Sequence, residues 1–159
     1  VATGFQRVGE LYARVELKAA QREAMALARE VNRYLDEKAP WFQIREDRQA
    51  AATTIFVALR AIDSIKLLLA PVLPFSSERL HGLLGYQEPL FGEIAIEPGP
   101  PTGGHEVLRY RPIPSEARDR WQPSELEPGR PLPPPQPLYQ KLDESVIEEE
   151  RQRLLAQSR

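Results

Sequence analysis

Proline is distributed very unevenly along this chain, and the distribution limits which parts can form regular structure. Of the 16 prolines, twelve lie between Pro98 and Pro137, a stretch that also holds Gly99, Gly103, Gly104 and Gly129. Proline removes a backbone donor and blocks helix interiors, so residues at this density do not build a second core. We predict an extended segment laid over the rest of the protein, or partly flexible loops.

The region before Tyr86 has the opposite character, because its apolar residues recur with helical spacing. Val8, Leu11, Tyr12 and Val15 follow the i, i+3, i+4, i+7 pattern. The phase slips at Glu16 and Leu17, after which a longer run extends to Leu35. We therefore expect a short helix and then one of about five turns, which Pro40 ends because its ring disfavours a helical Ala39.

Two further helices are expected in the bundle. Asp47 is suited to cap the run 48–69, whose apolar face recurs at Ala51, Ile55, Leu59 and Ile62. Pro71 stops this helix, and Pro74 fixes a turn. Ser76 and Glu78 then open a short helix that Gly85 closes.

The tail is predicted to be helical again. Asp143 caps a segment with a narrow apolar edge at Val146, Ile147, Leu154 and Leu155, which must pack on something. The predicted fold class is all-α: a helix bundle with a Pro-rich extended segment and a C-terminal helix packing back on it. The predicted parts are the bundle over 1–97, the Pro-rich segment over 98–142 and the C-terminal helix over 143–159. Anchors expected to hold the Pro-rich segment are Trp121, Leu132, Leu138 and Tyr139.

Composition excludes several functions. Without Cys, and with only His81 and His105, the chain has little material for a metal site or a nucleophilic triad, and we expect ordinary surface or half-buried histidines. No cofactor, metal or catalytic residue is predicted. A net charge of -2 gives no broad positive field for general nucleic-acid binding. No apolar run reaches the ~18 residues of a membrane span, and no signal peptide is evident, so a cytoplasmic protein is expected.

Three blocks of sequence resemble the anticodon-binding domain that follows the catalytic core of methionyl-tRNA synthetases. The first, "ALAREVNRYLDEKAPW", carries an Asn-x-Tyr and then a Pro-Trp pair at a helix end. The second is "LLLAPVLPFSSERLHGLLG". The third is "PGRPLPPPQPLYQKLDESVIEEE", in which Tyr139 stands where that family usually has Phe. The resemblance covers nearly the whole chain from about Gly4, except the stretch between Pro98 and Pro128.

The resemblance implies a role for the Pro-Trp pair. In the synthetases that the chain resembles, this Trp stacks on an anticodon base with the help of the Pro, and the matching positions are Pro40 and Trp41. Base–aromatic stacking is worth roughly 1–3 kcal/mol per base. Phe42 is expected to face the core. The other candidate anticodon contacts are Arg45 and Asn32, with Asn32 and Tyr34 also serving the fold, while Arg33 and Arg48 near the same corner are weighed as ion-pair partners.

The resemblance also implies partners and missing parts. The expected partners are initiator and elongator methionine tRNA and the catalytic domain of a parent chain, which would use ATP. The family's first bundle helix and the class I signatures have no match here, and the chain starts at Val1, so we expect a fragment of a larger enzyme.

Two alternatives stay open from the sequence. One alternative is that the chain is the equivalent domain of another class I synthetase. The other is that it is a non-catalytic interaction module whose "PGRPLPPPQP" docks on an aromatic groove. A buried Trp41 would favour the interaction module, whereas an exposed Trp41 beside basic side chains would favour anticodon binding.

Overall fold

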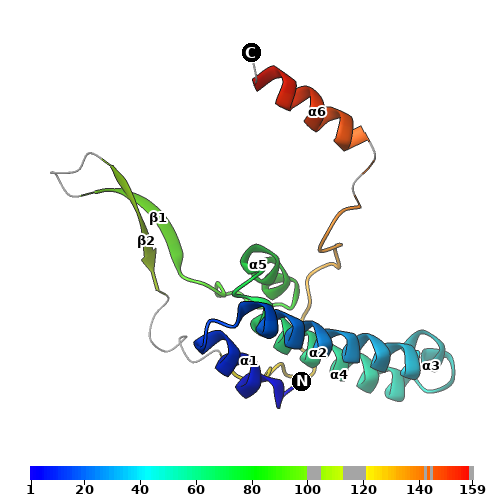
Figure 1. Ribbon diagram of the computed structural model, residues 1–159. Helices are drawn as coiled ribbons and strands as arrows, with labels where there is room; N and C mark the ends of the chain where they lie inside the picture. Colours follow the sequence, from blue (N-terminus) through cyan, green and yellow to red (C-terminus); the bar gives the residue numbers. More distant parts are fainter. Residues whose placement is uncertain (100–104, 113–120, 142, 144, 158–159) are drawn as a thin grey trace.

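The computed structural model describes residues 1–99, 105–112, 121–141, 143 and 145–157. Two long helices, α2 (Leu17–Lys38) and α4 (Arg48–Leu69), pack against each other and form the body of the molecule (Figure 1). Helix α1 (Gly4–Ala13) packs on α2, while α3 (Pro40–Glu46) and α5 (Pro74–Leu83) pack on α4. The predicted helix bundle is confirmed. Helix α3 was not expected, and α5 begins at Pro74 rather than at Ser76.

The phase slip after the first helical run is a sharp turn between α1 and α2. The N–H of Val15 donates to the carbonyl of Tyr12, and the N–H of Glu16 donates to the carbonyl of Leu11, each at 2.9 Å. These two bonds form a Schellman motif, which requires a left-handed residue at Val15. Its φ is indeed 61°.

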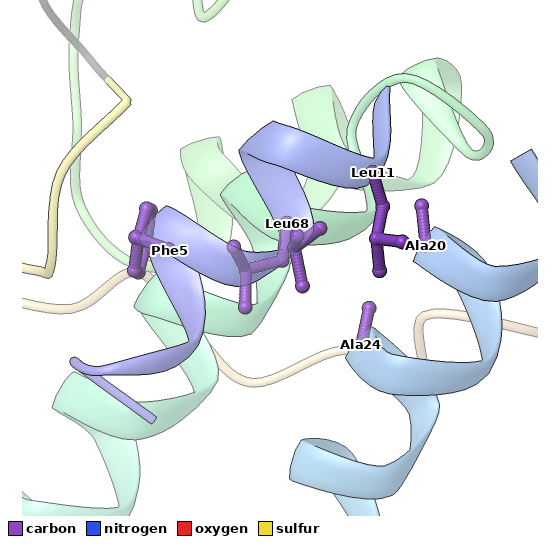
Figure 2. Close-up of a cluster of buried hydrophobic side chains, with 6 residues drawn as sticks. Phe5, Leu11, Ala20, Ala24 and Leu68 are labelled. Atoms are coloured by element: carbon purple, nitrogen blue, oxygen red, sulfur yellow. The ribbon is translucent and has the colours of Figure 1, made fainter. Parts of the chain in front are cut away.

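The core lies where α1 crosses the pair of long helices. Figure 2 shows Leu11 of α1 beside Ala20 and Ala24 of α2, with Phe5 of α1 on the other side of Leu68 of α4 in the same cluster. The two alanines on α2 have small side chains, so α1 approaches that helix closely. The hydroxyl of Tyr12 donates to the carbonyl of Leu68 at 3.2 Å and thereby ties α1 to α4.

A β-hairpin follows the bundle, and no strand was predicted there. Strands β1 (Glu93–Pro98) and β2 (Glu106–Arg111) are antiparallel, with Ile96 opposite Leu108 and Glu97 opposite Val107. In Figure 1 the hairpin projects from the bundle on the side of α5. Glycine is required at Gly92, because a Cβ there would collide with the carbonyl oxygen of Arg111. The Pro and Gly content around the strands hid their short alternating pattern.

The part of the Pro-rich segment from Trp121 to Tyr139 contacts the bundle, whereas the predicted start of the segment at 98 falls within the hairpin. Trp121 and Tyr139 anchor it: the indole packs edge-on against Phe5 and Tyr12, and the Tyr139 hydroxyl donates to Ser76 at 2.7 Å. Leu138 does so through its carbonyl, which accepts from Arg79 at 3.0 Å. Leu132 is exposed, and the most deeply buried residues of the segment, Ser124 and Leu126, were not anticipated.

The C-terminal helix forms, but it does not pack back on the bundle. Helix α6 (Ser145–Gln157) stands away from the other helices (Figure 1), and Ile147, Leu154 and Leu155 on its apolar edge are exposed. The expected start is confirmed, since the N–H of Ser145 donates to the Asp143 carboxylate at 3.0 Å. The Pro-rich segment leads away from the bundle before the helix begins, so the expected packing is wrong for this chain as described.

Candidate nucleic-acid interface

The corner between α2 and α4 is built by three residues with distinct roles. Ala39 ends α2 in the left-handed region, with φ 44° and ψ 58°, so the chain leaves the helix as Pro40 requires. Pro40 is the first residue of α3, where its missing N–H costs nothing. Asp47 separates α3 from α4, and its carboxylate accepts the N–H of Ala50 at 2.9 Å. The predicted cap at Asp47 is confirmed.

Helix α3 determines where the two adjacent aromatic rings point. Residues three apart lie on one helix face, and this face of α3 carries the buried Pro40 and Gln43. The Gln43 side chain accepts a hydrogen bond from the buried Thr54 hydroxyl on α4 at 2.9 Å. Trp41 and Phe42 therefore lie off the inward face and are 51% and 64% exposed. The expectation that Phe42 faces the core is wrong, because the chain is helical there and not extended.

Trp41 lies at the edge of an apolar groove of about 490 Å³. Its other walls come from Pro40, Ile44 and the α4 residues Arg48, Ala51, Ala52, Ile55, Phe56 and Leu59. The Trp41 and Phe42 rings are 6.4 Å apart between centroids, with 64° between their planes. The corner thus presents a flat indole beside an uncovered aliphatic surface, which an unpaired base can occupy by stacking.

Basic side chains flank this groove. Arg45 and Arg48 are exposed, and neither has an ion-pair partner among the residues that the structure describes. Arg33 differs, because it pairs with Glu30 and, at 3.8 Å, with Glu37 on its own helix. The geometry therefore leaves Arg45 and Arg48 available to phosphate groups, whereas Arg33 already has carboxylate partners.

The candidate residues do not all come together. Pro40, Trp41 and Arg45 belong to one corner, but Asn32 lines a different groove, of about 290 Å³, together with Leu138 and Tyr139. Asn32 is exposed on α2, and the structure gives it a position beside the Pro-rich segment instead of beneath Trp41. Its contact with an anticodon stays a prediction.

A buried polar cluster was missed from the sequence. Asp63 and Lys66 of α4 form an ion pair, Lys66 Nζ lies 2.7 Å from Nδ1 of His81, and the Tyr86 hydroxyl donates to Asp63 at 2.7 Å. Ser124 of the Pro-rich segment also donates to Asp63. His81 is thus buried, contrary to expectation. The signal that could have revealed the cluster is a charged pair three residues apart within the apolar run "AIDSIKLLLA".

Burial alone raises the pKa of the Asp63 carboxyl, but hydrogen bonds from Lys66, Ser124 and Tyr86 and the charge of Lys66 lower it below its ordinary value. Burial, followed by the hydrogen bond and the charge of Asp63, raises the pKa of Tyr86 to about 12. The cluster stabilises the junction of α4, α5 and the Pro-rich segment. The cluster also lines a pocket of about 470 Å³, whose other walls include Glu88, Glu125, Glu127 and Arg130.

Within the described ranges, no group of three or more His, Asp or Glu side chains is arranged to hold a metal ion. Among the same residues, no helix combines the length and the apolar character needed to cross a membrane.

Comparison with known proteins assigns the chain to a family. Residues 1–95 match the family model described as the anticodon binding domain of methionyl tRNA ligase. The whole chain is 86% identical to methionine–tRNA ligase of Thermomicrobium roseum, and 98% of it is 45% identical to that of Roseiflexus sp.. The methionine–tRNA ligase of Chloroflexus aurantiacus is 46% identical over 95% of the chain.

These matches cover nearly all of this chain but only a small part of each relative. The chain spans about a quarter of their length, 27% of the first and 26% of the second, and it matches their C-terminal part. The helical fold of the bundle is consistent with the family model that matches residues 1–95. The chain belongs to the family of anticodon-binding domains of methionyl-tRNA ligases.

Proposed function

We propose that the chain is the tRNA-recognising part of a longer methionine–tRNA ligase, and that Trp41 stacks on an anticodon base of initiator and elongator methionine tRNA. The observation that carries this proposal is the position of the indole. It is half-exposed at the end of the α2–α4 pair, beside an apolar groove and close in sequence to two arginines without described carboxylate partners.

The physical basis is that little conformational entropy of the Trp41 side chain is lost when a base binds. Trp41 is the second residue of α3, whose backbone is fixed by the buried Pro40 and by the Gln43–Thr54 hydrogen bond. A base that stacks on such a preorganised ring loses little free energy to side-chain ordering. Single-stranded bases are recognised in this way, by stacking combined with edge contacts.

The surrounding charge fits a local contact rather than a general one. The net charge of the chain is -2, so long-range attraction to RNA is weak. Arg45 and Arg48 instead supply short-range contacts to phosphates near the stacked base. In the longer enzyme, methionine activation with ATP would be carried out by the catalytic part, with no contribution from the residues described here.

The interaction-module alternative is less well supported. A buried Trp41 would have favoured it, whereas the ring is half-exposed. The Pro-rich segment is also already held on the bundle through Trp121, Ser124 and Tyr139. A segment with these internal contacts must be released before an aromatic groove can bind it.

The test uses the full-length enzyme and two reactions. Trp41→Ala is expected to lower kcat/KM for aminoacylation of methionine tRNA about 5- to 150-fold, which corresponds to the loss of one stack of 1–3 kcal/mol. Methionine-dependent exchange of pyrophosphate into ATP, measured without tRNA, is expected to change less than twofold. Equal loss in both reactions would indicate a folding role for the ring.

Phe42→Ala is the matched control, because Phe42 is adjacent, exposed and on the same short helix. It is expected to cost far less than Trp41→Ala in aminoacylation. A larger loss from Phe42→Ala would move the stacking role to that ring. Arg45→Gln and Arg33→Gln form a second matched pair, in which only Arg45→Gln is expected to weaken tRNA binding and reduce its salt dependence.

A further inference from the structure

The two faces of the β-hairpin have different chemistry. On one face, Ile96 lies opposite Leu108, and Tyr110 follows two residues along β2. On the other face, Glu97 forms ion pairs with Arg109 at 3.8 Å and with Arg111 at 2.5 Å, and Glu93 pairs with Arg111 at 3.4 Å. Such alternation is typical of an antiparallel sheet with one face in solvent and the other covered.

The cover for the apolar face is missing among the described residues. Ile96 is 68% exposed and Leu108 is 71% exposed. At the base of the hairpin, the N–H of Gly92 donates to the Tyr110 hydroxyl at 3.1 Å, and Tyr110 lines one pocket with Phe75 of α5. A two-stranded hairpin is marginally stable in water without packing on one face.

The uncovered surface continues onto the bundle. Phe75, Phe91 and Tyr110 line one apolar pocket of about 470 Å³ at the base of the hairpin, and Phe75 is 87% exposed. We call the connected set Phe75, Phe91, Ile96, Leu108 and Tyr110 the hairpin surface. Scattered exposed apolar residues need no explanation, but a contiguous aromatic and aliphatic patch marks an interaction site.

We propose that the hairpin surface docks on the part of the same polypeptide that precedes Val1 in the longer enzyme. The chain spans about a quarter of its relatives and matches their C-terminal part, so most of the polypeptide lies outside the structure. The inference rests on the proposal that the chain belongs to a longer ligase, but it does not depend on the role of Trp41.

The size of the surface favours this occupant over a second copy. Stable interfaces between independent chains involve about 20–30 residues on each partner, many more than the five residues of the hairpin surface. Domains joined in one chain meet through smaller interfaces, from about 600 Å², because the linkage raises their effective concentration. RNA is disfavoured, because the arginines of β2 are engaged by Glu93 and Glu97.

The position of the surface is compatible with tRNA binding. Figure 1 shows the hairpin projecting at the end of the bundle opposite α3, the helix that carries Trp41. Contact between the hairpin surface and the preceding part of the polypeptide therefore leaves the Trp41 groove open. It would also fix the orientation of the bundle relative to that part.

The decisive experiment places a photo-crosslinking amino acid, p-benzoylphenylalanine, at position 108 of the full-length enzyme. The matched control places it at position 109, on the ion-paired face of the same strand. Position 108 is expected to crosslink to peptides that precede Val1, at the mass of a single polypeptide, whereas position 109 is not. A product of twice that mass, a crosslink to added tRNA, or no crosslink from position 108 would each overturn the proposal.

Thermal unfolding of the full-length enzyme gives a second measurement. Leu108→Asp is expected to lower its Tm by several degrees, and Arg109→Asp to lower it less, because only Leu108 is covered in the proposed contact. Equal shifts would contradict the proposal. Both measurements are made without tRNA, and the crosslinking is also repeated with added tRNA. In the Trp41→Ala background the crosslink should be unchanged, so a failed anticodon proposal leaves this test intact.

Discussion

The indole N–H of Trp121 donates to the main-chain carbonyl of Phe5 at 3.0 Å, joining residues that lie 116 positions apart in the sequence. The ring also packs edge-on against Phe5 and Tyr12, with centroids 5.6 and 6.0 Å away. This relationship holds the start of the Pro-rich segment on α1. It explains why a segment with so little regular structure follows a defined path.

Trp121→Ala is expected to lower the free energy of unfolding by about 2 kcal/mol, because it removes these ring contacts and leaves the Phe5 carbonyl without its donor. Urea unfolding followed by far-UV circular dichroism measures the change. A Cβ at Gly9 would meet the indole nitrogen at 2.8 Å, so Gly9→Ala should destabilise the wild type. In the Trp121→Ala background the same change should stabilise, as Gly→Ala does within a helix. An unchanged sign would contradict the contact.

The Asp63–Lys66 pair makes stability depend on acid. The folded-state pKa of Asp63 is lower than its unfolded value of about 3.9, so its contribution is fully present above pH 4. The contribution is lost as the pH falls through the folded-state pKa. Asp63→Asn is therefore expected to flatten the loss of stability below pH 4, and to cost about 3–5 kcal/mol at pH 7, because Lys66 is left buried without its carboxylate.

The check is chemical denaturation at several pH values between 2 and 7. Asp63→Asn combined with Lys66→Met is the matched control, because it removes both charges from the interior. The double variant should recover much of the stability lost at pH 7. If the single variant retained the acid dependence of the wild type, the lowered pKa of Asp63 would not be its source.

Tyr86 is expected to make stability fall at alkaline pH, the opposite of the effect of Asp63. Its folded-state pKa is raised to about 12 from an ordinary value of 10, so its contribution to stability is present below pH 10 and is lost as the pH rises toward 12. Tyr86→Phe should remove this alkaline dependence. In a spectrophotometric titration it should also remove the part of the phenolate absorbance near 295 nm that develops at the highest pH. A titration that ends at the same pH in both proteins would exclude the predicted shift.

Local patterns predicted the bundle because each helix boundary has a local cause. Pro40 ends α2, Asp47 caps α4, and Gly85 follows α5 with a φ of 81°. The misassigned side chains depend on partners distant in the sequence. Phe42 was placed inward because α3, a helix of seven residues, is too short to produce a readable period.

The same limit applies to the candidate site. The Pro-Trp motif singled out Trp41 as a candidate, and the half-exposed position of its ring follows from α3 packing on α4. The charged pair Asp63 and Lys66 was readable in the sequence, but its partners were not, because Ser124, Tyr86 and His81 reach it from three different segments. The outward course of α6 depends on the segment before it, and sequence periodicity shows only that the helix has an apolar edge.

Val15 provides the last prediction, because it is a β-branched residue held in a left-handed conformation. Its φ of 61° is required by the Schellman motif that ends α1, and its side chain is mostly exposed. The left-handed region costs such a residue roughly 1–2 kcal/mol relative to glycine, while glycine increases the entropy of the unfolded chain. Val15→Gly is thus expected to stabilise the protein by about 1 kcal/mol, measured as a higher Tm. Val57→Gly, on the exposed face of α4, is the same substitution in an ordinary helical conformation and should lower the Tm. If both variants lowered the Tm equally, the turn between α1 and α2 would not hold Val15 in the left-handed region.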